Sequence, residues 1–502
     1  MSERTHRHVV ADAATAPRPR RAAPEKERAA KKKPTKPRPH GHTELPPQPA
    51  EMSGRDYLIM LLHIGAEIEH ALMVEYLYAA YSLGGSGVGA RGDTVREWQD
   101  QFVTVAREEM GHLLTVQNAL LLVGGPVSFE RDDYPWSSPF CSFDFELEPL
   151  TLGSLAKYVY TEMPPPESLE REEDKETVAA VEKLVGSFAR APVGELYERI
   201  IELVSDPRVI PDSAFQAGSY AHQMNWDEWG RGYRPDSHKP YAKNPDVPPP
   251  HARRATVIVE KCATRTELVS TLREIASQGE AEHLRSNAKS EASHFDRFAH
   301  MFRAYQAILA EDPAFVPARR VPKNPVVAPD EAYAPRGAAA ITCEESRAWA
   351  SLFNVRYRML LTLLTSACSG PRDMPALLTV RRAPLIARIF GEMYNLKAIA
   401  NVLVRLPLGD PKKPERAGPP FQMPYTLVPP APEANFWRLQ RDLLATSGTM
   451  VDDLLDRAGR AGTHLPADGL HYLRALRETD AASAAWIDLV LAELTPGRRT
   501  KP

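Results

Sequence analysis

The sequence has few cysteines and no long uninterrupted apolar run. Its four cysteines (Cys141, Cys262, Cys343 and Cys368) lie far apart and form no Cys-x-x-Cys pair. This pattern is typical of reduced thiols in a cytoplasmic protein and argues against a zinc site built from them. No stretch has the roughly 18 consecutive apolar residues of a transmembrane helix, so we expect no membrane partner.

Several functional motifs are also missing. We find no internal repeat, no glycine-rich phosphate loop and no nucleophile elbow. What is present is the composition of a soluble globular protein, with 43% hydrophobic and 25% charged residues. A chain of 502 residues is too long for one ordinary core, and this length predicts two domains plus tails.

Positive charge is concentrated at the start of the chain. Residues 1–50 contain twelve Lys or Arg against five acidic residues, a local charge of +7, whereas the whole chain carries −3. They also contain nine prolines and few large apolar residues, so we expect a disordered tail without a secretory signal. A basic tail can tether a protein to nucleic acid or an anionic surface. We favour a solvated tail and expect no nucleic-acid partner.

Four segments have the apolar spacing of helices. Three of them begin at sequences that resemble capping boxes: Ser53-Gly54-Arg55-Asp56, Thr94-Val95-Arg96-Glu97 and Thr264-Arg265-Thr266-Glu267. The first two are expected to end at the glycine pairs Gly84-Gly85 and Gly124-Gly125. A fourth helix is predicted from about residue 287 to residue 310. Four helices of this kind can form one bundle.

About 140 residues separate the second predicted helix from the third, which is far longer than a bundle loop. This stretch is rich in proline and aromatic residues and includes a helical piece over 194–201. It could serve as a substrate wall or only as a packing shell, and both readings stay open. Residues 313–340 are expected to be a linker. Beyond it, helices are predicted over 344–366, 374–406, 434–461 and 467–494.

The four bundle segments carry a set of carboxylates and histidines. Two Glu-x-x-His pairs are Glu109/His112 and Glu291/His294, and two lone glutamates are Glu69 and Glu280. A carboxylate-bridged di-iron or di-manganese site in a helical bundle needs this inventory. A Glu and a His at positions i and i+3 lie on one helical face and can reach one ion. Buried carboxylates also need a partner, so the set predicts a metal centre.

Residues near these ligands have weaker assignments. Glu108 lies about 100° around the helix from its neighbour and should face solvent or a salt bridge. His70 is expected to be an ordinary, partly buried histidine. Glu75 lies off the face of Glu69, beside the centre or at the surface. Tyr76 returns to that face and could line the pocket, although a core tyrosine is the more frequent case.

The spacing of Glu280 and Glu291 constrains this scheme. On one continuous helix, eleven residues would separate them by about 16 Å, too far for one pair of metal ions. The scheme therefore requires a helix break, which we expect near Arg285-Ser286-Asn287. Glu280-Ala281-Glu282-His283 is a further Glu-x-x-His, so the assignment of the third and fourth helices stays open.

These segments resemble the iminophenyl-pyruvate dimer synthase family, the group named for the violacein-pathway enzyme. The resemblance covers roughly residues 55–310 and continues more weakly into residues 403–407 and 417–421. It is carried by Ala66-Glu67-Ile68-Glu69-His70-Ala71-Leu72, Tyr76-Leu77-Tyr78-Ala79-Ala80-Tyr81-Ser82, Glu108-Glu109-Met110-Gly111-His112, Leu122-Val123-Gly124-Gly125-Pro126, Gln278-Gly279-Glu280 and Ser293-His294-Phe295-Asp296-Arg297-Phe298. The resemblance implies a ferritin-like fold and a role in natural-product biosynthesis, by oxidation or oxidative coupling of amino-acid-derived molecules.

We therefore expect an all-α protein with a ferritin-like four-helix bundle. The predicted parts are a basic tail (1–50), a ferritin-like di-metal domain (51–312, insertion about 126–263), a linker (313–340) and a C-terminal helical domain (341–496). The leading hypothesis is a di-iron oxidoreductase, with manganese as the other metal, that uses O2 or peroxide on a small molecule. An iron-storage protein and a structural protein with a relic site are the alternatives. A homo-oligomer is left open.

Overall fold

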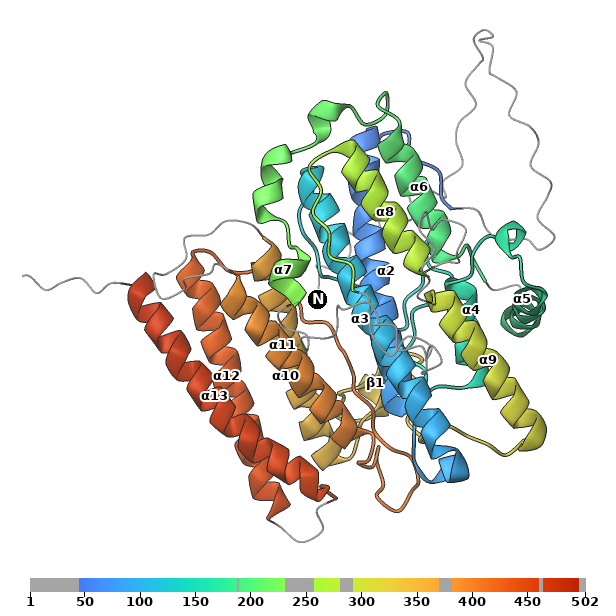
Figure 1. Ribbon diagram of the computed structural model, residues 1–502. Helices are drawn as coiled ribbons and strands as arrows, with labels where there is room; N and C mark the ends of the chain where they lie inside the picture. Colours follow the sequence, from blue (N-terminus) through green and yellow to red (C-terminus); the bar gives the residue numbers. More distant parts are fainter. Residues whose placement is uncertain are drawn as a thin grey trace, which may run out of the picture.

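The protein is all-α, as the sequence predicts, and its helices form two adjoining groups (Figure 1). The structure is a computed structural model that describes residues 45–186, 189–230, 257–279, 292–369, 382–459 and 464–495. The basic tail expected over residues 1–50 falls almost wholly outside these ranges. The helices of the first group are α2 (Gly54–Ser82), α3 (Gly92–Leu122), α4 (Leu152–Thr161), α5 (Glu172–Val185), α6 (Val193–Ser205), α7 (Trp226–Trp229), α8 (Arg265–Gly279) and α9 (His294–Glu311).

Helices α2 and α3 form the centre of the bundle and pack against each other along their lengths. The predicted start of α2 is confirmed, because the Ser53 side chain accepts a hydrogen bond from the backbone N–H of Asp56. The predicted start of α3 at Thr94 is wrong by two residues. A 3₁₀ turn, η1 (Ser86–Arg91), leads directly into α3 at Gly92, so that Thr94 already lies inside the helix.

Helix α2 is long and apolar enough to meet the length and composition test for a membrane span, with a mean hydropathy of 1.4 in its best window. Of that window, 72% is buried inside the protein. The core helix of a soluble bundle passes the same test, and the packing of α3 and α6 on α2 accounts for its apolar surface.

The other two sides of the bundle are each made of two shorter helices. Figure 1 shows α8 followed along the bundle by α9, with α6 beside α8 and α4 beside α9. Rings from α2, α3, α4 and α9 pack together in one cluster, which consists of Tyr76, Phe102, Tyr158 and Phe298. The stretch expected to be an insertion therefore supplies α4 and α6, two of the bundle's own helices. The helical piece predicted over 194–201 is part of α6.

Helix α8 is described as far as Gly279, and α9 begins at His294 after the non-helical residues Ala292 and Ser293. The break expected near Arg285-Ser286-Asn287 lies outside the described residues and stays a prediction. The prediction that the last helix begins near residue 287 is wrong. Ser293 is an extended N-cap that forms a capping box with Asp296, and Ala292 is also non-helical. Residues 280–291, including both Glu280 and Glu291, lie outside the described residues.

The C-terminal group follows the predicted ranges closely. It contains α10 (Glu344–Cys368), α11 (Ala383–Leu403), α12 (Glu433–Ala458) and α13 (Ala467–Leu494), preceded by two short parallel strands, β1 (Pro325–Val326) and β2 (Ala339–Ala340). One buried cation joins all four helices. Arg356 of α10 pairs with Glu392 of α11 and Asp480 of α13, and it donates to the Ser447 hydroxyl of α12 at 2.8 Å.

The chain segment that precedes α8 crosses α3 at a glycine. The Thr115 hydroxyl donates to the carbonyl of Ile258 at 3.1 Å, and the Asn118 amide donates to that of Glu260 at 2.8 Å. A Cβ atom at Gly111 would lie only 2.6 Å from the Ile258 carbonyl oxygen. Gly111, between Glu109 and His112, therefore permits a close backbone approach that a larger residue would prevent.

We predict that Gly111→Ala lowers the free energy of unfolding by about 1–3 kcal/mol, because either α3 or the crossing backbone must shift. The measurement is a chemical denaturation curve. Gly448→Ala is the matched control, since Gly448 lies inside α12 with no atom within 4 Å of an added Cβ. That substitution should stabilise the protein by about 0.5–1 kcal/mol through helix propensity. Equal effects of the two substitutions would contradict the close approach at Gly111.

Candidate metal centre

Two groups of buried side chains in the bundle could each hold a metal ion, and they share one carboxylate. The first group is Glu69, Glu109 and His112, and the second is Glu109, Glu162 and His294. One oxygen of Glu109, Oε2, lies 2.8 Å from Nδ1 of His112, and the other, Oε1, lies 3.0 Å from Nδ1 of His294. Glu109 thus has the position of a carboxylate that bridges two ions.

The remaining two carboxylates complete the two groups from opposite sides. Glu69 Oε2 lies 3.5 Å from Nδ1 of His112, and Glu162 Oε2 lies 3.6 Å from Nδ1 of His294. Glu69 and Glu109 come from the continuous helices α2 and α3, whereas Glu162 is the C-cap of α4 and His294 is the first residue of α9. The centre therefore lies where the two outer sides of the bundle are interrupted.

The outward nitrogens of both histidines have hydrogen-bond partners. His112 Nε2 lies 2.9 Å from the Gln278 side-chain oxygen, and His294 Nε2 lies 3.1 Å from the Glu108 carboxylate. Because both partners accept, we assign the Nε2 atoms as donors. In a neutral ring this leaves the Nδ1 lone pair directed at the carboxylates. Fixing a histidine through its outer nitrogen in this way is typical of metal ligands.

Glu108 is wholly buried, and its charge is balanced by a buried arginine. Arg297 Nη1 lies 2.5 Å and Nη2 lies 3.3 Å from the two carboxylate oxygens. Of the two expectations for Glu108, the salt bridge is correct and solvent exposure is not. Burial raises the pKa of Glu108, but Arg297 and His294 together bring it below its usual value. Glu108 thus stays charged and orients His294.

The inner groups have strongly shifted pKa values. Burial, and then the neighbouring Glu109 charge, raise the pKa of Glu69 to about 7. Burial opposes charge on His112, but hydrogen bonds to Glu109 and Glu69 raise its pKa to about 10. The pKa of His294 is likewise raised well above its usual value by the nearby carboxylates, against the effect of burial. A cation bound among these groups would compensate the same carboxylate charges that raise the histidine pKa values.

Two buried atoms suit a metal ion better than a proton. Glu109 Oε1 and His294 Nδ1 form an ion pair at 3.0 Å, but within the described part of the chain neither atom makes a well-aligned hydrogen bond. Buried polar atoms without well-aligned partners are costly. A cation placed between the carboxylate and the imidazole would satisfy both lone pairs. The oxygen and nitrogen donors of the two groups therefore fit a pair of metal ions.

Two tyrosines hold the outer carboxylates. The Tyr197 hydroxyl of α6 donates to Glu69, and the Tyr76 hydroxyl of α2 donates to Glu162. Tyr76 is buried in the aromatic cluster and also reaches the centre, so its two expected roles are combined. A small pocket with about 320 Å³ of free space adjoins these groups, and it is bounded on one side by Ile275, Ala276 and Gly279 of α8.

The structure thus brings together four of the six residues predicted as ligands: Glu69, Glu109, His112 and His294. Glu280 and Glu291 lie outside the described residues, and their roles stay predictions. His70 is fully buried, rather than partly buried as expected, and contacts the Tyr357 hydroxyl. Glu75 takes part in neither group.

Sequence analysis missed Glu162. It follows a ten-residue helix with Tyr158, Val159 and Tyr160 at its end, and a proline run begins two residues later. An acidic residue between an apolar helix end and prolines is a weak signal, because helix C-termini rarely favour acids. The unfavourable position of an acidic residue at a helix C-terminus is the one sequence signal that could have indicated Glu162 as a ligand.

We predict that Glu108→Ala lowers the free energy of unfolding by about 3–5 kcal/mol, because it leaves the Arg297 charge buried without its carboxylate. Denaturation of the metal-free protein measures this effect. Glu202→Ala is the control, since Glu202 is 73% exposed and pairs with Arg199 at 3.8 Å. Loss of that surface pair should change stability by less than about 1 kcal/mol. A similarly small effect at Glu108 would contradict the proposed buried pair.

Comparisons with known proteins agree with this architecture. Residues 62–303 match the sequence family described as Ferritin-like. Dichlorochromopyrrolate synthase of Lentzea aerocolonigenes is 26% identical over an alignment 401 residues long, which covers 74% of this chain and 36% of that protein. The chain thus spans about a third of the length of this relative. No solved structure matches the chain. Residues 62–303 therefore form a ferritin-like domain, and the resemblance seen in the sequence is confirmed.

Proposed function

We propose that the protein is a di-metal oxidoreductase of natural-product biosynthesis that oxidises or couples an amino-acid-derived small molecule. The observation that carries this proposal is the shared carboxylate, Glu109, which faces His112 with one oxygen and His294 with the other. Two adjacent ions joined by a carboxylate are the arrangement used by helical bundles that react with O2. Glu69 and Glu162 would be the terminal carboxylates.

The donor set favours iron, with manganese as the second choice. Carboxylate and imidazole ligands suit both ions, and no cysteine takes part in either group. Such ions, when bound, supply the redox chemistry toward O2 or peroxide. The chain supplies the rest. Tyr197 and Tyr76 orient the terminal carboxylates, and Glu108 and Gln278 orient the imidazoles.

The surroundings of the centre favour a reaction that excludes bulk water. Tyr76 and Phe102 are fully buried beside Tyr158 and Phe298, so an apolar layer covers one side of the centre. Water exclusion strengthens the electrostatic interactions of the ligands and protects reactive species from side reactions. A storage protein has no need of a pocket lined partly by the long stretch between α3 and α8, whereas a substrate oxidation does.

The biosynthetic part of the proposal comes from the relative. Dichlorochromopyrrolate synthase is, by its name, an enzyme that builds a chlorinated natural product. The aligned region is about a third of that enzyme, so its substrate is not transferred to this chain. From this relative we therefore propose only the type of pathway, natural-product biosynthesis, for this chain.

We predict that the protein, loaded with ferrous iron without oxygen, binds about two ions per chain. Glu109→Ala should lose both ions because the two groups share this carboxylate, whereas Glu162→Ala should lose about one. Elemental analysis after gel filtration measures the content. Glu280→Ala tests Glu280, the ligand predicted from the sequence, as the alternative to Glu162.

The metal contents of the variants distinguish between the possible ligand sets. Full metal content in Glu162→Ala together with a loss in Glu280→Ala would replace Glu162 by Glu280 as the ligand. Full content in Glu109→Ala would contradict the shared carboxylate and with it the di-metal centre. Glu202→Gln, at the exposed surface of α6, controls for nonspecific iron on acidic side chains.

We further predict that O2 consumption by the iron-loaded protein depends on an organic substrate. An oxygen electrode would measure consumption over many turnovers, with Glu109→Ala as the inactive comparison. Consumption that stops after the bound iron has been oxidised once, with any candidate amine or amino-acid derivative present, would favour the iron-storage alternative. Absence of bound metal would favour the structural one.

A further inference from the structure

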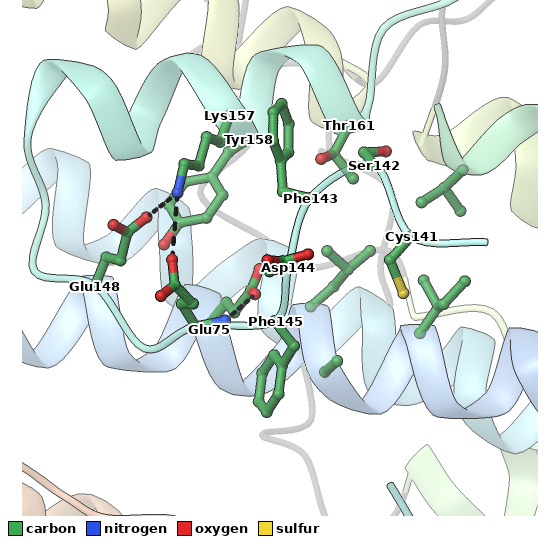
Figure 2. Close-up of a pocket in the computed structure, with 15 residues that line it drawn as sticks. Glu75, Cys141, Ser142, Phe143, Asp144, Phe145, Glu148, Lys157, Tyr158 and Thr161 are labelled. Carbon is green, nitrogen blue, oxygen red and sulfur yellow. Dashed lines mark hydrogen bonds and ion pairs between the residues drawn. The ribbon is translucent and has the colours of Figure 1, made fainter. Parts of the chain in front are cut away.

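A second pocket adjoins the metal centre and is the larger of the two. It contains about 480 Å³ of free space and lies between α2, α4 and the chain over residues 141–148 (Figure 2). This free space includes the part of the pocket that is open to solvent. Leu72, Thr161 and Val193 line both this pocket and the pocket at the centre. These three residues, which we call the shared wall, are all that the two linings have in common.

The charges that line the larger pocket are mostly negative. Four carboxylates, those of Glu75, Asp144, Glu146 and Glu148, face one ammonium group, that of Lys157. Three of the four are balanced by cations. Asp144 pairs with Arg190 at 2.9 Å, and Glu146 and Glu148 share Lys157 and Lys323 in one network.

Glu75 is the carboxylate that remains. Within the described residues, its carboxylate accepts one hydrogen bond, from the backbone N–H of Glu146 at 3.3 Å. Within the described residues no Lys, Arg or His lies close enough to form an ion pair with it. Burial, the largest effect, raises the pKa of Glu75 to about 8. A carboxyl group in such a place gains charge balance when a cation binds beside it.

A second polar group in the pocket wall also lacks a partner. Tyr158 is only 3% exposed, so water cannot easily reach its hydroxyl. Within the described part of the chain this hydroxyl has no hydrogen-bond partner. Burial and then the nearby Glu75 charge raise its pKa well above the usual value. Buried hydroxyls normally find a partner, so this one indicates a ligand atom. Figure 2 shows Tyr158, Lys157, Glu148 and Glu75 toward one end of the pocket and Cys141 toward the other.

The rest of the lining is apolar or aromatic. Phe143 and Phe145 extend from the loop, and Ile68 and Ala71 come from α2. Aromatic faces attract a cation as well as an apolar body. An ammonium group has three donors and no acceptor, so it can use the Glu75 carboxylate and the Tyr158 hydroxyl oxygen at once.

We propose that this pocket binds a small molecule with a protonated amine and an apolar, preferably aromatic, body, held at its nitrogen by Glu75 and Tyr158. The shared wall places the far part of such a molecule next to the metal centre. The proposal thus deepens the proposed function by giving the substrate class of the same site. Its binding step needs no metal and no oxidant.

The same lining disfavours a carboxylate ligand. The Lys157 ammonium already contacts Glu148 at 2.7 Å and Glu146 at 3.7 Å. Its positive charge is therefore already balanced and would attract an added anion only weakly. An incoming carboxylate would also meet three acids that hold their own partners. The pocket should therefore distinguish ligands by the sign of their charge.

The test uses three probes that share a phenyl ring and a two-carbon chain: 2-phenylethylamine, 2-phenylethanol and 3-phenylpropanoate. Isothermal titration of the whole, metal-free chain would measure their affinities at pH 7. We expect the amine to bind at least about tenfold more tightly than the alcohol, and the acid most weakly. Glu75→Gln, which keeps the acceptor for the Glu146 N–H, should remove the preference for the amine. Glu202→Gln, a surface substitution on the same kind of residue, should keep it.

Each outcome decides the matter. Equal binding of amine and alcohol, tightest binding of the acid, or an unchanged preference in Glu75→Gln would overturn the proposal. The ranking in the wild-type protein needs no variant, and Tyr158→Phe provides a second one that retains the ring. Metal content is measured on the same samples. A correct ranking without metal binding would refute the proposed function but not the amine pocket, and metal binding with a wrong ranking would refute the pocket alone.

Discussion

The position of the Glu109 carboxylate between two imidazoles is the constraint on which the rest of the bundle depends. Its two oxygens lie 2.8 and 3.0 Å from nitrogens that belong to different helices, α3 and α9. To hold charge in a buried place, the fold must also supply outer partners for both rings. Gln278 at the end of α8 and the Glu108–Arg297 pair provide them. Three helices are thus fixed around one carboxylate.

The interrupted sides of the bundle follow from the same constraint. A continuous helix presents ligands at intervals of three or four residues on one face, as α3 does with Glu109 and His112. Glu162 instead follows the last residue of α4, and His294 opens α9 directly after its N-cap. Ends of helices can approach the centre along the bundle axis, which a side chain in mid-helix cannot do.

The sequence predicted those parts in which local chemistry and tertiary packing agree. The Thr264–Glu267 capping box forms as expected, and the C-terminal helices lie within the predicted ranges, or close to them, because their apolar periods are long. Short helices such as α4 were not predicted. Glu162 follows only ten helical residues, and no spacing rule connects it to Glu109. The Ser293–Asp296 box is also present in the sequence, but the break predicted near Ser286-Asn287 placed the start of the helix upstream of it. Long-range pairs, such as Glu108 with Arg297, have no local signature.

The two pockets differ in charge balance and therefore in the kind of cation that each can bind. At the centre, three carboxylates and two imidazole lone pairs converge on a space that small, hard cations fit. In the larger pocket, pairing with Lys157, Lys323 and Arg190 leaves one carboxylate and one aromatic hydroxyl, which suits a single organic cation. The two sites meet at Leu72, Thr161 and Val193, which are uncharged. A bound amine would therefore keep its charge away from the metal ions and turn its apolar end toward them, and repulsion between like charges would enforce that orientation.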